Sequence, residues 1–115
     1  MSSLMTFTQR EPLTEHEALD YVQSLGYHSL AFDDSHDVDE ELHWHEFNSV
    51  AIVVSGSGSF ADETGAVTQG QPGCMVTADA GWLHRTLAGT QTRVVLGSNM
   101  PFNEWSHPIN KPPVA

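Results

Sequence analysis

Three histidines have the residue type and the spacing of a metal site. His43 and His45 flank Trp44. In a β-strand alternate side chains share a face, so both imidazoles would point the same way, with Trp44 opposite. His84 follows a turn at residues 79–83, and such a turn can return a third imidazole to the first two. A solvated pair of histidines on an exposed strand is the alternative, and the spacing alone leaves the two interpretations about equal.

The same alternation divides the neighbours of the pair between two faces. Phe47, Ser49 and Ala51 share the face of the two histidines and are expected to line the interior, Phe47 mainly as packing. Glu46 and Asn48 fall on the opposite face. Either could bind a metal only if a β-bulge shifted the register. We therefore expect Glu46 at the surface or behind the ligands.

Three further residues are open to a functional and a structural interpretation. Trp82 could wall the opening of a pocket or fill the core. Arg85 directly follows His84, so in a strand it points away from that histidine, which favours a surface ion pair over a contact with substrate. Cys74 is the single cysteine. It is expected to be a buried core residue and not a catalytic thiol, and it allows no internal disulfide.

The elements that would position these residues are mostly short strands. A Thr14-to-Glu17 capping box, helical spacing of apolar residues and a stop at Gly26 predict one helix over residues 15–25. Elsewhere, short apolar runs alternate with Gly, Asp, Asn and Pro, which indicates an all-β fold, a sandwich or barrel. The predicted strands cover residues 28–32, 41–47, 50–54, 58–61, 66–68, 74–77, 84–87 and 92–96.

The chain is expected to form one domain over residues 1–115, with the barrel at about 28–98 and an arm at about 99–115. The arm is too rich in proline for a central strand, and we expect it to dock by Phe102 and Trp105. A small barrel leaves open sheet edges, which predicts a homodimer. The two aromatic residues of the arm are candidates for exchange onto the second copy.

Composition excludes several classes of partner. The 115 residues carry four basic and fifteen acidic side chains, a net charge of −11 with neutral histidine, which disfavours nucleic acid and anionic membranes. No apolar stretch approaches the roughly 18 residues of a spanning helix. The first ten residues lack the features of a secretory signal, so a cytoplasmic location is expected. The acidic run at residues 33–41 is interpreted as a solvated loop in preference to a calcium site.

The segment from Asp37 to Leu96 resembles the cupins, a family of small double-stranded β-helix proteins. The first cupin motif has the form G-x5-H-x-H-x3,4-E-x6-G, and the chain matches it at both histidines and at Gly56. Asp37 replaces the first glycine of the motif, and Ser49 stands in the position of the glutamate.

The second cupin motif, G-x5-P-x-G-x2-H-x3-N, is matched at full spacing by Gly73, Gly81 and His84. Asp79 stands in the position of the proline and Ala88 in that of the asparagine. The resemblance implies an all-β double-stranded β-helix, the cupin jelly-roll barrel, with the N-terminal helix packed outside.

By this resemblance His43, His45 and His84 would bind one divalent metal ion inside the barrel, with Fe(II) favoured and Ni, Mn or Zn as alternatives. Ser49 removes the usual fourth ligand, so the expected site has three histidines and open positions. The implied function is a metal-dependent dioxygenase acting on a small organic substrate that chelates through oxygen. A metal-dependent lyase or isomerase and a non-catalytic binding module are the alternatives, and the fold does not decide between them.

Overall fold

The computed structural model describes residues 5–113, which form seven strands, one α-helix and a short 3-10 helix. In chain order these are β1 (Thr6–Gln9), α1 (Glu15–Ser24), β2 (His28–Ser35), β3 (Ser49–Asp62), β4 (Val67–Gly70), β5 (Cys74–Ala78), β6 (His84–Thr86), β7 (Gln91–Ser98) and η1 (Phe102–Glu104). The predicted all-β class with one N-terminal helix is confirmed.

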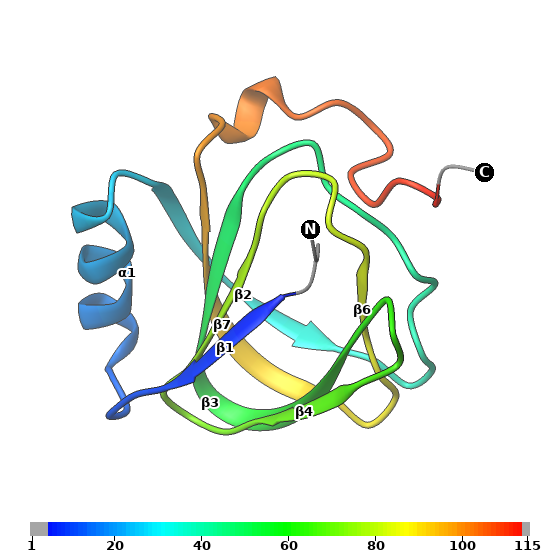
Figure 1. The fold of residues 1–115 in the computed structure, drawn as a ribbon. Helices are drawn as coiled ribbons and strands as arrows, with labels where there is room; N and C mark the ends of the chain where they lie inside the picture. The colour runs from blue at the N-terminus through cyan, green and yellow to red at the C-terminus, as the bar shows by residue number, and fades with distance from the viewer. Residues whose placement is uncertain (1–4, 114–115) are drawn as a thin grey trace.

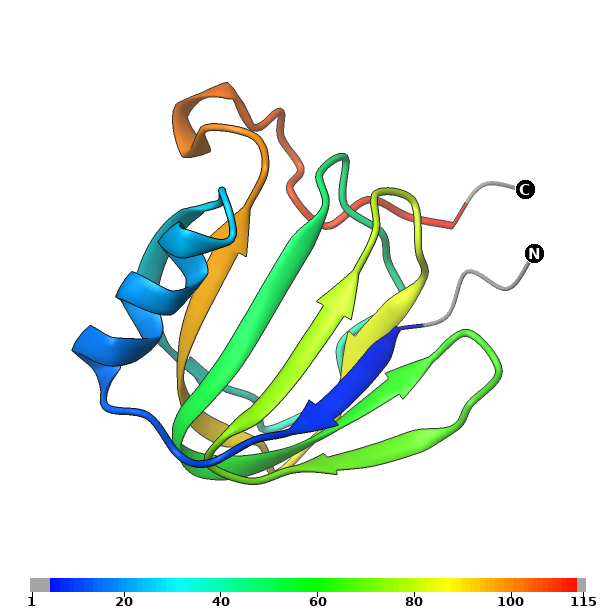
Figure 2. The same ribbon diagram turned by 60° about the vertical axis from the view of Figure 1, so that its left-hand side comes forward.

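Strand β3 organises the sheet, because its two halves pair with different strands. The first half lies between β5 and β7, in the order β1-β5-β3-β7-β2. The second half pairs with β4 and β6. All these pairs are antiparallel, and the two halves curve around a common interior with α1 outside it (Figures 1 and 2). The C-terminal segment passes over one end of this interior (Figure 1).

The sequence predicted two strands at residues 50–54 and 58–61, and the structure corrects this to one continuous strand. A register shift between Val53 and Ser55 bends β3 in place of a turn. Gly56 has φ +79, and a Cβ there would lie 2.0 Å from the Gln91 carbonyl oxygen. The glycine therefore lets the strand bend closely against β7.

The predicted strand at residues 41–47 is also wrong as a continuous element. His43 pairs only with His84, and Trp44 pairs only with Lys111. His43 and Trp44 thus pair with different segments on different sides, so no continuous β-ladder extends through residues 41–47. Strand β1 was not predicted from the sequence, because its four residues are too few to show a recognisable alternation of apolar and polar side chains.

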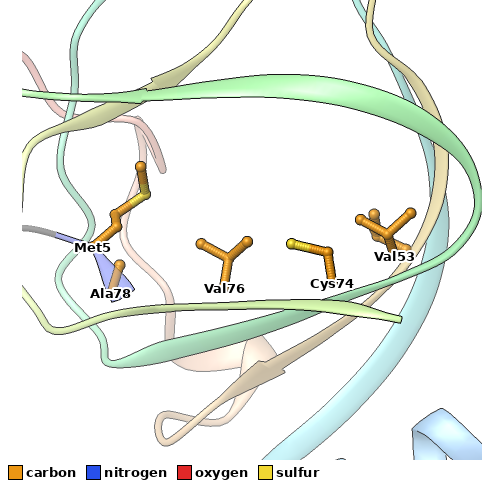
Figure 3. Packing of buried hydrophobic residues seen from close by; sticks show 6 residues of the cluster. Met5, Val53, Cys74, Val76 and Ala78 are labelled. Atoms are coloured by element: carbon orange, nitrogen blue, oxygen red, sulfur yellow. The ribbon is translucent and has the colours of Figure 1, made fainter. Parts of the chain in front are cut away.

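Two apolar clusters lie on the two faces of the curved sheet. The inner cluster includes Val53, Cys74, Val76 and Ala78, and side chains of β5 and β3 meet there (Figure 3). The predicted core position of Cys74 is confirmed, since the residue is buried and forms no disulfide. The outer cluster joins the helix to the sheet through Ala18, Val22, Val50, Ile52 and Val95. Alternation along β3 supplies both clusters.

The helix begins with the predicted capping box. The Glu17 amide donates to the Thr14 hydroxyl oxygen, and the Thr14 amide donates to the Glu17 carboxylate. A Cβ at Gly97 would lie 2.4 Å from Val22 Cγ1, so this glycine allows the helix to approach β7. Among residues 5–113, no helix is long and apolar enough to cross a membrane.

Candidate metal centre

The three predicted histidines lie together in the structure. His43 and His84 form an antiparallel bridge in which the amide of each donates to the carbonyl of the other, at 3.0 and 2.9 Å. The ring centroids of His43 lie 5.0 Å from His45 and 4.6 Å from His84. One ring nitrogen of each residue lies within 4.8 Å of the other two. Residues 40 positions apart in sequence thus form one cluster.

Backbone carbonyl groups fix the orientation of all three rings. Nδ1 of His43 donates to the Glu41 carbonyl oxygen at 2.7 Å. Nδ1 of His84 donates to the Trp82 carbonyl oxygen at 2.9 Å. Nδ1 of His45 donates to the carbonyl oxygen of Ile109 at 3.0 Å. A carbonyl can only accept, so in each neutral ring the proton is on Nδ1 and the lone pair of Nε2 is free.

Burial keeps His45 and His84 in the neutral form that a metal requires. His43 is 5% exposed. Loss of hydration lowers the pKa of His84 to about 4, and the same cause lowers the pKa of His45. The Glu40 carboxylate acts on both pKa values in the opposite direction, but its effect is smaller than that of burial. At neutral pH His45 and His84 are therefore uncharged.

These residues fit a divalent transition metal. Three neutral nitrogen donors suit Zn, Cu, Fe or Ni better than Mg or Ca, which prefer oxygen. Hydrogen bonds from the second ring nitrogen to carbonyl groups are the usual outer contacts of metal-binding histidines. Within residues 5–113, the cluster contains no carboxylate, so open positions would remain for a substrate.

The additional ligands considered from sequence lie outside the cluster. Glu46 is turned toward the C-terminal arm, where its carboxylate accepts from the Ser106 amide and hydroxyl. Asn48 accepts from the Ala80 amide. Ser49 lines the cavity described below, and its hydroxyl donates to the Ala78 carbonyl oxygen at 3.4 Å. These contacts agree with the sequence analysis, which placed Ser49 on the inner face of the chain and Glu46 and Asn48 on the opposite face.

A cavity of about 390 Å³ adjoins the cluster inside the barrel. Its wall is mostly apolar and includes Phe47 and Ala51, as alternation predicted. Trp82 does not line it and instead packs against the inner core cluster, which corrects the interpretation of that residue as a pocket wall. Arg85 does line it, and among the described residues Arg85 forms no ion pair, contrary to the expectation of a surface salt bridge.

The C-terminal arm, defined as residues 99–113, covers the side of the cluster that carries His45. The His45 ring stacks on Phe47, with centroids 4.9 Å apart, and Phe47 stacks on Trp105 at 4.2 Å. The Trp44 indole donates to the Pro112 carbonyl oxygen at 2.8 Å. The arm docks by its aromatic residues as predicted, but it packs on its own barrel and supplies the carbonyl that orients His45.

Sequence reasoning missed three contributors to this site. The Ile109 carbonyl carries no side-chain signal, so no sequence pattern could have identified it. Glu40 and Asp34 both line the cavity, yet they stand in a run of six acidic residues, where single functional members are hard to distinguish. The alternation of Leu30, Phe32 and Asp34 could have indicated that Asp34 faces inward.

Comparison with known proteins identifies the fold through structure alone. No protein-family model matches the sequence, and no curated protein is significantly similar to it. Among solved structures, the chain is similar to a salicylate 1,2-dioxygenase from Pseudoaminobacter salicylatoxidans, with 16% identity and a TM-score of 0.54. The match covers 64% of this chain and 20% of the dioxygenase, so the chain spans one fifth of that enzyme.

Two further similarities have comparable strength. A DUF861 family protein from Thermotoga maritima matches with 15% identity and a TM-score of 0.56, over 80% of this chain and 96% of that protein. A structure from a study of DMSP lyases matches with 18% identity and a TM-score of 0.55, over 68% of this chain and 41% of that one. These structures are cupin-type proteins. The chain therefore has the cupin fold, a double-stranded β-helix.

Proposed function

We propose that this protein is a metal-dependent enzyme, a dioxygenase that acts on a small organic substrate able to chelate a metal through oxygen. The observation that carries the proposal is the close approach of one ring nitrogen from each of three histidines, with each ring held through Nδ1 by a backbone carbonyl. Similarity to a salicylate 1,2-dioxygenase supports the reaction class as a fold-level analogy.

The residues of the site have separate tasks in this proposal. His43, His45 and His84 would hold the ion, and the absence of a carboxylate ligand leaves its positive charge to attract substrate oxygen atoms. A bound Fe(II) ion would supply the redox chemistry needed to activate dioxygen. The apolar wall around Phe47 would bind the body of the substrate, and Trp105 on the arm would shield that end from water.

The metal content and oxygen consumption of the protein test the proposal together. Protein loaded anaerobically with Fe(II) is expected to bind one ion per chain and to consume oxygen with at least one member of a panel of hydroxy acids and diols. His84→Ala should lose both properties, whereas Glu63→Ala, which removes an exposed carboxylate from the turn between β3 and β4, should keep them.

Each alternative function predicts a different outcome. Turnover of a substrate without oxygen would indicate a lyase or isomerase. Stoichiometric metal without turnover would indicate a binding module. Failure of the wild-type protein to retain any divalent metal would contradict the proposal itself. Parallel loading with Ni, Mn and Zn determines which ion supports activity, because nitrogen ligands alone do not select iron over nickel or zinc.

We further propose that the protein forms a homodimer. The cytoplasmic location stays a prediction from the sequence. Strands β1 and β2 end the sheet order and leave edges that a second copy could cover. The arm packs on its own chain, so exchange of the arm is not needed for this assembly. Sedimentation at micromolar concentration should show a dimer, and a monomer alone would contradict it.

A further inference from the structure

One carboxylate faces the apolar cavity at a distance from the three histidines. Leu30, Phe32 and Asp34 occupy alternate positions of β2, and all three line the cavity. Alternate residues of a strand share a face, so Asp34 continues the inward row that the two apolar residues begin. A charged group beside apolar surface is unfavourable unless it has partners, so the position of Asp34 calls for an explanation.

His36 holds Asp34 in place but leaves half of its carboxylate free. Nε2 of His36 lies 2.7 Å from Asp34 Oδ1, and the two side chains are 19% and 25% exposed. The His36 backbone is anchored on both sides, by its amide to Thr90 and by its carbonyl to Gly89, each at 2.9 Å. Among residues 5–113, Asp34 Oδ2 has no hydrogen-bond donor.

The register of β3 separates this carboxylate from the histidine cluster. His84 pairs with Asp62 on β3. Asp34 pairs with Thr92 of β7, and Thr92 pairs with Gly56 of β3. Six residues at about 3.3 Å each therefore separate the two levels by about 20 Å measured along β3. Asp34 thus faces the cavity at a level away from the histidines, and Glu40 and Arg85 also line the cavity.

We propose that Asp34 is a specificity-determining residue, and that the substrate carries a hydrogen-bond donor, a hydroxyl or amino group, at the end opposite its metal-chelating oxygens. The body between the two ends is apolar. This inference rests on the proposed metal site, and it adds the class of molecule that the site accepts. The free oxygen of Asp34 accepts from the donor, while a substrate with an alkyl group there would remove water from the carboxylate without replacing it.

A matched set of metal-binding probes tests the inference. Benzohydroxamate chelates divalent metals through two oxygens, and its para position can carry ethyl, hydroxymethyl or aminomethyl. The three groups are of nearly equal size, and they present no donor, a neutral donor and a cationic donor. Affinities are measured by calorimetry on Zn-loaded wild-type protein and variants, so the readout does not depend on catalytic activity.

Wild-type protein is expected to bind at least one donor probe about ten- to a hundredfold more tightly than the ethyl probe, the effect of one hydrogen bond to a charged group. Asp34→Ala should bring that ratio close to one. Asp34→Asn should keep a preference for hydroxymethyl and lose one for aminomethyl. Asp33→Ala, which removes the neighbouring carboxylate paired with Arg93 on the other face of β2, should leave the ratios unchanged.

Two results would overturn the inference while leaving the proposed function intact. In the first, the ethyl probe binds the wild-type protein as tightly as both donor probes. In the second, the wild-type preference persists in both Asp34 variants, with thermal unfolding showing that they are folded. If the ethyl probe binds the metal-free protein but not the Zn-loaded protein, or if the protein binds no metal, the proposed metal site is wrong. The inference about Asp34 is then wrong with it.

Discussion

Acidification of the metal-free protein tests the buried histidine cluster without any assumption about its reaction. Burial lowers the pKa of His84 to about 4, from an ordinary value of 6.5. Between these two values the unfolded chain binds a proton at this residue and the folded chain does not. The free energy of unfolding should therefore fall as the pH drops below 6.5, and this loss should be complete near pH 4.

The size of the effect follows from the interval between the two pKa values. At about 1.4 kcal/mol per pH unit, an interval from 6.5 to about 4 corresponds to a loss of about 3 kcal/mol. The pKa of His45 is lowered for the same reason and adds a loss in the same direction. A small domain typically has about 5 to 15 kcal/mol of stability, so the loss is a substantial fraction.

Urea unfolding in the presence of a chelator, at half-unit steps from pH 7.5 to 4, measures this dependence. His84→Gln removes the titrating group and should flatten the curve between pH 6.5 and 4.5. His16→Gln is the matched control, because His16 lies on the helix with its side chain 85% exposed. Carboxylates with lowered pKa, such as Glu46, act at lower pH and equally in all variants. A wild-type stability that stays level or rises on acidification would refute the argument.

Three further predictions concern the metal site and the arm. His43→Ala and His84→Ala should each abolish stoichiometric metal in elemental analysis after identical loading, and Glu46→Ala should retain it. Ser49→Glu should tighten metal binding in competition with a chelating dye and reduce turnover, because a carboxylate would fill a position that substrate needs. Deletion of residues from Trp105 onward should weaken metal binding about ten- to a hundredfold by freeing the His45 ring, and unchanged affinity would show that the arm plays no part in orienting it.

The parts of the fold that sequence analysis predicted are those with local signals. The helix has a capping box and a terminal glycine within thirteen residues, so its bounds could be predicted closely. Alternation assigned Phe47, Ser49 and Ala51 to the cavity and Glu46 to the other side. The turn before His84 left its grouping with the other two histidines open, and resemblance to the cupin motifs decided it, because the residues are about 40 positions apart.

The parts that were missed depend on contacts between distant segments. The sequence predicted separate strands at residues 50–54 and 58–61, but whether the glycine-containing segment between them turns or bends through a bulge depends on the strands beside it. The segment at residues 41–47 has the composition of a strand, yet it lacks one neighbour that follows its whole length. Asp34 could not be distinguished from its acidic neighbours by sequence, and the role proposed for it depends on the cavity that it faces.

The histidine cluster owes its geometry to backbone groups from three separate segments. Glu41, Trp82 and Ile109 act through their carbonyl oxygens, so many different side chains at these positions would orient the histidines equally well. The rings are held in one tautomer by folding, before any metal binds, so metal binding needs little further ordering of the ligands. Because one of the three carbonyls belongs to the arm, any change that lifts the arm also loosens His45. We therefore expect metal affinity and closure of the cavity to be coupled through a single hydrogen bond and the stack of Phe47 on Trp105.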